Sequence, residues 1–192
     1  MTPTEYAEKL RAQLDDLTLY NRPLLLAATS TVVEMASRIF VKGLATDGSK
    51  IGNYSKKDLY LSDNQIASLP NVKSTRKGKT GKNKFKDGKE HKTTWFEGWY
   101  GVREEAGRNT DKVDLSFTGD LQSEFTNSVR VNDAKPNYID TNTYETRVTT
   151  ELNVNKARGN EKHFGKEIFT VSPQEKEIFY STAEYELKLM FE

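Results

Sequence analysis

One apolar stretch near the N-terminus constrains the fold more than any other part of the chain. Residues 24 to 42 place apolar side chains at helical spacing, which predicts one long helix. A buried stripe this broad suits a central helix packed on a sheet. Gly43 follows the stretch in the manner of a C-terminal helix cap, since glycine adopts a left-handed backbone at little cost. The stripe consists of Leu24, Leu25, Ala28, Val32, Met35, Ala36, Ile39 and Phe40.

Both ends of the chain carry the signals of a helix start. Thr2-Pro3-Thr4-Glu5 combines a threonine cap, a proline at the first helical position and a glutamate three residues after the cap. This capping box predicts a first helix that runs to about Leu17. Ser172-Pro173-Gln174-Glu175 is a second capping box, and it predicts a C-terminal helix.

The segment between Gly43 and Lys92 shows no sustained periodicity and is rich in Gly, Ser, Asn, Asp and Lys, which predicts a long loop region. Its second half, Asn71 to Lys92, holds nine basic residues against Asp87 and Glu90. The whole chain has 29 basic and 28 acidic residues, so the rest of it is net acidic. The nine candidate contact residues are Lys73, Arg76, Lys77, Lys79, Lys82, Lys84, Lys86, Lys89 and Lys92.

This basic segment permits two kinds of partner. Its lysines would release counterions from a nucleic-acid backbone and give salt-dependent binding without sequence preference. Because Phe85 is its only aromatic residue, it is not a stacking platform for single strands. A solvated loop that docks on an acidic neighbour, including the net acidic body of an identical subunit, is the other interpretation.

Extended structure is predicted after the basic segment. The aromatic residues Trp95, Phe96, Trp99 and Tyr100 indicate an extended stretch that contacts the core. Residues 128–131 and 144–154 then alternate in polarity, and a turn-rich stretch around Pro136 separates them, so an antiparallel hairpin is predicted.

The predicted fold class is α+β. An antiparallel sheet packs against the long central helix, with N- and C-terminal helices and a long basic loop. At 192 residues the chain is predicted to form a single domain, 1–192, with the basic loop 71–92 inserted in it. The start of the chain lacks a secretory signal, and the longest apolar run, Leu24 to Ala28, is too short to cross a bilayer, so no membrane partner is predicted.

The turn after the central helix has a pattern close to that of a phosphate-binding loop. Gly43 to Lys50 reads G-x-x-x-x-G-S-K, with the last two residues of a P-loop exchanged. A P-loop follows a buried strand, whereas a helix precedes this segment. The pattern therefore favours a helix cap and a turn, and the predicted structural turn residues are Gly43, Asp47, Gly48 and Gly119.

No pattern of residues predicts catalysis. The chain has no cysteine, and its two histidines, His91 and His163, lack metal-ligand spacing. No serine lies in a G-x-S-x-G elbow. We therefore predict no catalytic residue, no cofactor, no metal and no enzymatic activity.

Three stretches, in this order, resemble a known family. "RIFVKGLATDGSKIGNYS" (38–55), "VDLSFTGDLQSEFTNSVRV" (113–131) and "EKHFGKEIFTVSPQEKEIF" (161–179) resemble segments of the tail-completion, or virion-morphogenesis, proteins of tailed bacteriophages and of related head-tail connector proteins. Together they cover about half of the chain.

The resemblance implies a structural subunit of the phage neck or tail, located in the virion and in the host cytoplasm during assembly. It implies a homo-oligomeric ring, six-fold or twelve-fold, that contacts portal or adaptor and tail proteins and surrounds genomic DNA. In such a subunit Phe40 and Leu115 would pack beneath the turn. The alternative is an accessory protein that binds nucleic acid through the basic segment without sequence preference.

Overall fold

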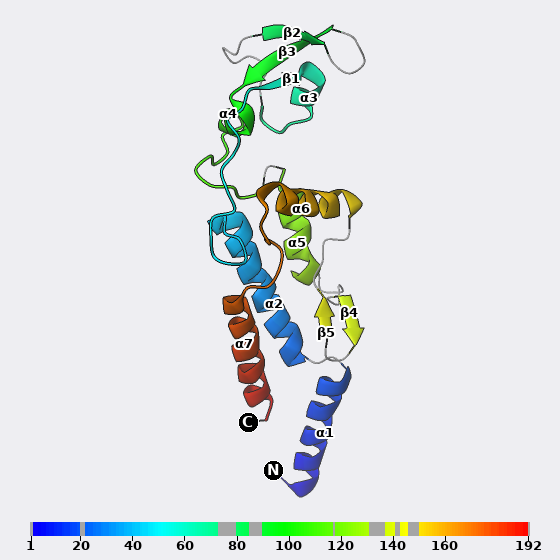
Figure 1. Ribbon diagram of the computed structural model, residues 1–192. Coiled ribbons are helices and arrows are strands. Elements are labelled where there is room, and N and C mark those ends of the chain that lie inside the picture. The colour runs from blue at the N-terminus through cyan, green and yellow to red at the C-terminus, as the bar shows by residue number, and fades with distance from the viewer. Residues whose placement is uncertain are drawn as a thin grey trace.

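The structure is a computed structural model that describes residues 2–19, 22–72, 80–84, 90–116, 118–130, 137–140, 143–145 and 150–191. Figure 1 shows an elongated molecule with the longer helices at one end and a small sheet with two short helices at the other. The elements in chain order are α1 (Pro3–Leu19), α2 (Arg22–Ala36), the π-helix η1 (Ser37–Lys42), β1 (Leu59–Ser62), α3 (Asp63–Ala67), β2 (Thr80–Lys84), β3 (Glu90–Phe96), α4 (Gly98–Glu105), α5 (Asp120–Arg130), β4 (Asn137–Asp140), β5 (Thr143–Glu145), α6 (Glu151–Phe164) and α7 (Pro173–Phe191).

The helices predicted at the two ends and in the centre are confirmed. α1 begins with the expected box, in which the Glu5 side chain accepts from the Thr2 amide at 2.7 Å and the Glu5 amide donates to Thr2 Oγ1 at 3.2 Å. α7 begins with the second box, in which Ser172 and Glu175 exchange the same two bonds. The central helix α2 continues into η1, and Gly43 ends it with φ 69.

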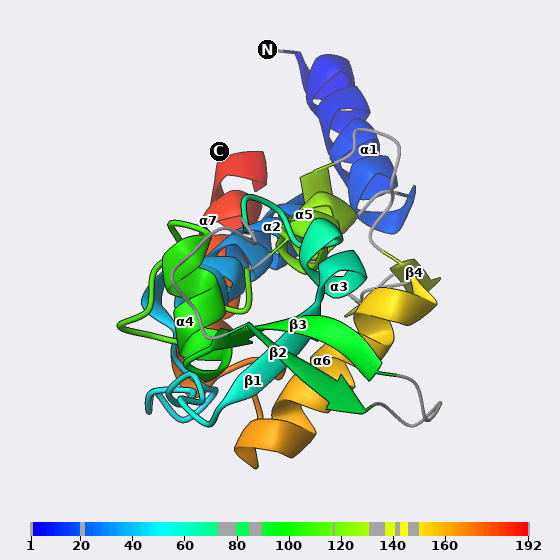
Figure 2. The same cartoon turned by 90° about the horizontal axis from the view of Figure 1, so that it is seen from above.

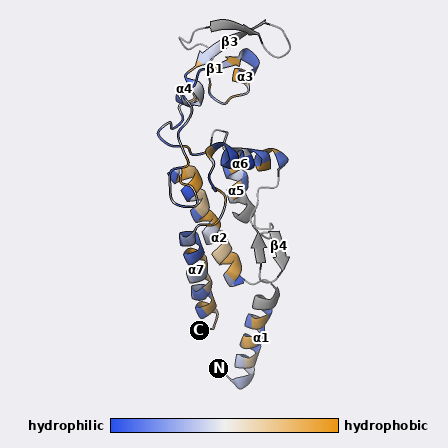
Figure 3. Ribbon diagram, in the orientation of Figure 1, coloured by the Kyte–Doolittle hydropathy of each residue, from blue (hydrophilic) through white to orange (hydrophobic). Residues whose placement is uncertain are grey.

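The α+β class is also confirmed, with a long central helix at the middle of the helical end. α7 runs antiparallel beside α2, α5 packs on another side, and β5 also contacts α2 (Figure 1). Figure 3 shows α2 as the most continuously apolar of these helices. The core around it is formed by Val32, Met35, Ala36, Ile39, Phe40, Ala45, Ile51, Val113, Leu121, Phe125 and Ile168.

A second buried cluster lies in the part of the chain between β1 and α4, which we call the distal lobe (residues 59–105). Its strands form an antiparallel sheet in the order β1-β3-β2, and Figure 2 shows this sheet from above. Leu61, Ile66, Phe96 and Val102 pack together in it, apart from the core around α2. The described residues of the predicted insertion 71–92, which are 71–72, 80–84 and 90–92, belong to this lobe, and the single-domain assignment stays a prediction.

A hairpin was predicted for residues 128–131 and 144–154, and this prediction is wrong for most of the residues in these ranges that the structure describes. Ser128 to Arg130 end helix α5, and Glu151 to Val154 begin helix α6. Only Tyr144 and Glu145 are in a strand, and this strand pairs with β4, where a turn was predicted. Tertiary contacts outweigh the alternating pattern, since Leu152 is 63% exposed while Asn153 is buried against the Glu124 side chain of α5.

The predicted loop between Gly43 and Lys92 contains regular structure in its described part. β1, the short helix α3, β2 and the first residues of β3 fall within it. A capping box starts α3, because the Gln65 amide donates to Ser62 Oγ while the Gln65 side chain accepts from the Ser62 amide. The basic segment is therefore not one continuous loop.

One described helix, Arg22–Lys42, has the length and composition of a membrane span, with a mean hydropathy of 1.5 in its most apolar window. Half of that window is buried inside the protein. The core helix of a globular protein passes the same test, and α7 and α5 cover α2 here.

Candidate functional site

The turn after the central helix lies where several distant segments meet. Gly43 has φ 69, and a Cβ at this position would come within 2.7 Å of the Val113 carbonyl oxygen. Leu44 and Lys50 form a short antiparallel bridge that closes the turn. Gly48 has φ 78, and Gly119, which has φ 84, accepts the first helical hydrogen bond of α5 from Ser123. Phe40 lies in the core beneath the turn, and Leu115 packs against that core.

The backbone amides of this turn donate to acceptors within the protein. The Leu44 amide donates to Arg38, the Ala45 amide to Ser49 and the Gly48 amide to Ala45, all at carbonyl oxygens. The Ser49 amide donates to the Asp47 carboxylate at 2.9 Å, and the Thr46 amide to the Glu167 carbonyl at 3.0 Å. A P-loop instead directs its amides at a phosphate, so this arrangement is that of a structural turn.

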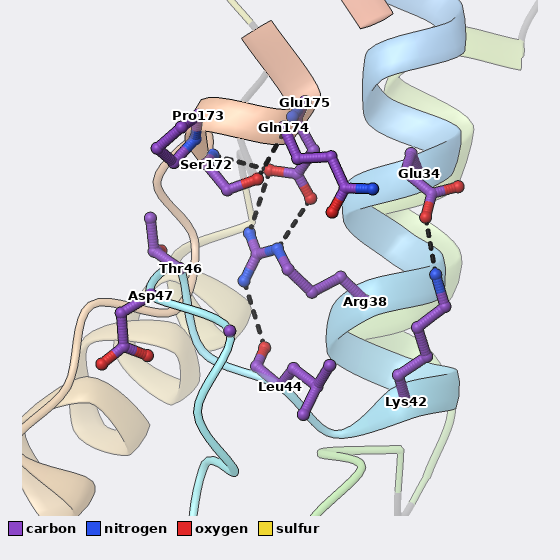
Figure 4. A pocket seen from close by; sticks show the side chains of 11 residues that line it. Glu34, Arg38, Lys42, Leu44, Thr46, Asp47, Ser172, Pro173, Gln174 and Glu175 are labelled. Carbon is purple, nitrogen blue, oxygen red and sulfur yellow. Dashed lines mark hydrogen bonds and ion pairs between the residues drawn. The ribbon is translucent and has the colours of Figure 1, made fainter. Parts of the chain in front are cut away.

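A pocket of about 250 Å³ lies between the turn, the end of the central helix and the start of α7 (Figure 4). Its centre is an ion pair between Arg38 and Glu175 whose side chains are 8% and 2% exposed, with 2.7 Å between Nε and Oε1. The guanidinium also donates to the Leu44 and Thr170 carbonyl oxygens at 3.1 and 3.0 Å. Arg38 therefore joins three segments.

The polar contacts in this pocket connect chain segments to one another. Glu175 accepts from Arg38 and, through Oε2, from the Ser172 amide at 2.7 Å, so one carboxylate both caps α7 and neutralises the buried cation. At the rim, Lys42 and Glu34 pair with 2.7 Å between Nζ and Oε1. Among the lining residues there is no histidine or cysteine that could activate a nucleophile.

Asp47 is held in its charged form by the turn itself. Hydrogen bonds from the Ser49 hydroxyl and amide lower the pKa of Asp47 from its ordinary value of 3.8, and Lys166 adds a smaller electrostatic contribution. Lys166 also donates to Ser49 Oγ and to the Lys50 carbonyl, which ties the turn to the segment after α6. These contacts orient the turn from both sides.

A second buried charge pair lies where the distal lobe joins the helices. Arg103 of α4 donates through Nη2 to both carboxylate oxygens of Asp114, at 2.8 and 2.9 Å. Its guanidinium lies 4.3 Å from the ring centre of Tyr54, whose hydroxyl accepts from the Asp114 amide at 3.1 Å. Burial raises the pKa of Tyr54 to about 12. We call Tyr54, Arg103 and Asp114 the junction cluster.

The basic residues fall only partly within the described chain. Lys82 and Lys84 lie in β2 and Lys92 lies in β3, where the register places Lys82 opposite Lys92 and Lys84 opposite Glu90. The remaining candidates, Lys73, Arg76, Lys77, Lys79, Lys86 and Lys89, lie outside the described residues. This hairpin is at the end of the molecule opposite α1 and the C-terminal end of α7 (Figure 1).

Within the described part of the chain, no group of three or more His, Asp or Glu side chains could hold a metal ion. Comparisons with protein-family models, with curated proteins and with solved structures find no match.

The buried ion pairs were not identified from the sequence. Glu175 was recognised as a capping residue, but its partner Arg38 lies 137 positions away. The available signal was a charged residue at position 38, between Met35 and Ile39 of the apolar stripe. Arg103 and Asp114 carried no comparable signal.

Proposed function

We propose that this chain is a structural subunit of the head-tail connector, neck or tail of a tailed bacteriophage, and that it acts as a homo-oligomeric ring joining the portal to the tail. In this role it is not an enzyme, and its partners are copies of itself, portal or adaptor proteins and tail proteins. It would reside in the virion after assembly in the host cytoplasm.

One observation carries this proposal: the three stretches that resemble the family meet around the same turn. Residues 38–55 contact residues 161–179 through the Arg38–Glu175 ion pair. They contact residues 113–131 where the Phe40 and Phe125 rings lie 5.9 Å apart. Residues 113–131 and 161–179 meet at Phe125 and Phe169, whose ring centres are 6.0 Å apart. The resemblance therefore coincides with one structural unit.

The shape of the chain supports an assembled state. An elongated subunit with a lobe at one end and helices at the other has surface available for two neighbours, as a ring requires.

The alternative of a free nucleic-acid-binding accessory protein rests on the hairpin register. The register places Lys82 of β2 opposite Lys92 of β3, so basic residues 10 positions apart in the sequence come together in this hairpin, and clustered lysines bind a nucleic-acid backbone without sequence preference. A ring around DNA would also bind the DNA backbone through these lysines. The two functions are therefore distinguished by the oligomeric state of the chain and by its protein partners.

Co-expression with the portal and tail proteins encoded beside its gene tests the proposal. We expect the chain to copurify with the portal and to stay bound in salt that releases DNA. A variant in which Lys82, Lys84 and Lys92 are replaced by Thr is the informative comparison, since it removes charge while keeping good strand formers. The proposal would be overturned if the chain stays a monomer, does not bind the portal and binds duplex DNA in a salt-sensitive way.

A further inference from the structure

The distal lobe has a buried cluster of its own. Leu61, Ile66, Phe96 and Val102 are each at most 7% exposed and pack on one another. Among the described elements, the strands and short helices of the lobe make their larger packing contacts with each other, and the helices around α2 do the same among themselves. The two parts are therefore joined mainly through the segments that connect them.

The outgoing segment passes from one part to the other within two residues. Tyr54 packs against the core around α2. Ser55, the next residue, is bound to the lobe, because its carbonyl oxygen accepts from the Tyr100 amide of α4 at 3.1 Å. The change from helical end to lobe therefore occurs at residues 54–55.

The returning segment leaves the lobe just after α4. The Arg108 amide still donates to the Arg103 carbonyl oxygen at 2.8 Å, whereas Val113 is 1% exposed in the core around α2. Residues 109–112 lie between these two anchors and contain no helix or strand. When two packed parts share only a small polar interface, relative motion is the default expectation.

One buried cluster spans both connections. Arg103 lies in the last turn of α4 and is 2% exposed, and it donates to both carboxylate oxygens of Asp114 and to the Asn109 carbonyl oxygen. Asp114 directly follows a core residue, and Tyr54, which lies beneath the guanidinium, packs against the same core. Arg103 belongs to the lobe, so the junction cluster holds the lobe against the helices at one angle.

We infer that the distal lobe turns as a rigid body about residues 54–55 and 109–112, and that the Arg103–Asp114 ion pair is the latch that fixes its angle. A hinge needs only a few residues that absorb the change in backbone angles. Opening the latch exposes the two charges to water and leaves both buried clusters intact. The inference goes beyond the proposed function and does not depend on it, because a monomer would have the same hinge.

The hinge gives the basic hairpin a way to move. β2 and the start of β3 lie at the far end of the lobe from the helices (Figure 1). A turn at the junction therefore displaces this hairpin more than the rest of the lobe. One chain could then present the hairpin to a partner at more than one angle.

Distances between spin labels test the hinge in the full chain, because the chain has no cysteine of its own. The labels are placed at Ala67→Cys on α3 and Leu152→Cys on α6, both at exposed positions. Labelled protein is diluted with unlabelled chain, so that distances between copies do not contribute. Pulsed electron paramagnetic resonance should give one narrow distance distribution. Asp114→Asn leaves the buried guanidinium without its counter-ion and should broaden that distribution.

Two controls separate the latch from general effects. Glu97→Gln removes the exposed ion pair between Glu97 and Lys56, which lies on the lobe side of the junction, and it should leave the distribution unchanged. A second pair of labels, at Leu152→Cys and at Glu177→Cys on α7, lies within the helical end and should stay narrow in every variant.

Fluorescence shows whether the lobe stays folded when the latch is broken. Trp95 and Trp99 are the two tryptophans of the chain, and both lie in the lobe. Arg103→Lys is a second way to weaken the latch, because lysine keeps the charge but cannot bind a carboxylate through two parallel hydrogen bonds. We expect both Asp114→Asn and Arg103→Lys to broaden the distance distribution and to keep the tryptophan emission of the wild type.

Three results would overturn the inference. The first is a broad distribution in the chain with an intact latch. The second is the absence of broadening in every latch variant that keeps the wild-type emission. The third is loss of that emission in both latch variants, which would show that the lobe does not hold together without the latch. A failure of this kind would leave the proposed function standing, since the distances are measured within one copy.

Discussion

Arg38 and Glu175 are 137 positions apart in the chain and form a buried ion pair with 2.7 Å between Nε and Oε1. Around this pair the central helix, the glycine turn and the start of the last helix are held together. Breaking it by Glu175→Gln should destabilise the fold by about 3–5 kcal/mol, because an unpaired guanidinium is then left buried. Glutamine can still accept the capping hydrogen bond.

Urea unfolding followed by far-UV circular dichroism measures this effect. The matched control is Glu184→Gln, which removes the exposed partner of Lys188 on the same helix and should change stability very little. A Glu175→Gln protein as stable as the Glu184→Gln protein would show that the buried pair does not hold these segments together.

The contribution of the glycine turn to stability should depend on pH through Asp47. Since the pKa of Asp47 is lowered by its bonds to Ser49, the folded state binds fewer protons at this carboxyl than the unfolded state. Its contribution to stability is present above the ordinary pKa of 3.8 and is lost as the pH falls through the folded-state pKa. Carboxyl NMR titration should give Asp47 a midpoint below 3.8, and Ser49→Ala should raise that midpoint. An unchanged midpoint in Ser49→Ala would refute the stated cause.

Tyr54 in the junction cluster titrates at high pH, in contrast to Asp47. Burial raises its pKa to about 12, so the folded protein keeps the phenol protonated where the unfolded chain begins to lose the proton. The stabilisation is fully present below pH 10, the ordinary value, and disappears as the pH rises through about 12. The difference in ultraviolet titration between wild type and Tyr54→Phe should contain a tyrosine with this high midpoint, whereas a midpoint near 10 would mean that the hydroxyl is solvated.

Two segments connect the helical end with the distal lobe, and Gly98 at the start of α4 lies close to Ser55 of the first segment. It has φ 58, and a Cβ at this position would come within 2.0 Å of the Ser55 carbonyl oxygen. Gly98→Ala must therefore move one backbone segment, and we expect a loss of about 2–4 kcal/mol together with faster hydrogen exchange in the distal lobe. Gly48→Ala is the control, because Gly48 also has a positive φ but nothing within 4 Å of the added Cβ, so only about 1–2 kcal/mol of strain is expected. Equal losses in the two variants would contradict the close approach of Gly98 to Ser55.

The parts of the fold that the sequence predicted are those set by local signals. Capping boxes at Thr2 and Ser172 and the cap at Gly43 marked the ends of helices, and the apolar stripe marked the central helix. These signals act within a few residues, so no knowledge of distant contacts was needed.

The errors arose where distant contacts decide the structure. Alternation in residues 144–154 suggested a strand, but Glu124 of α5 accepts from the Thr150 amide at 2.6 Å and from Asn153, which favours the start of a helix there. The first part of the distal lobe, residues 59–92, has the sequence of a loop because its short strands are separated by polar residues. The extended stretch predicted after it is correct for Trp95 and Phe96 of β3 and wrong for Trp99 and Tyr100, which lie in helix α4. In the candidate site the turn glycines were identified, whereas the long-range partners of Arg38 and Arg103 were not.

Electron microscopy of the chain assembled on its portal tests most directly whether copies of this chain form a ring between portal and tail. We expect a closed ring of fixed copy number stacked on the portal. Portal particles without added density, together with a chain that sediments as a monomer at every concentration, would contradict it.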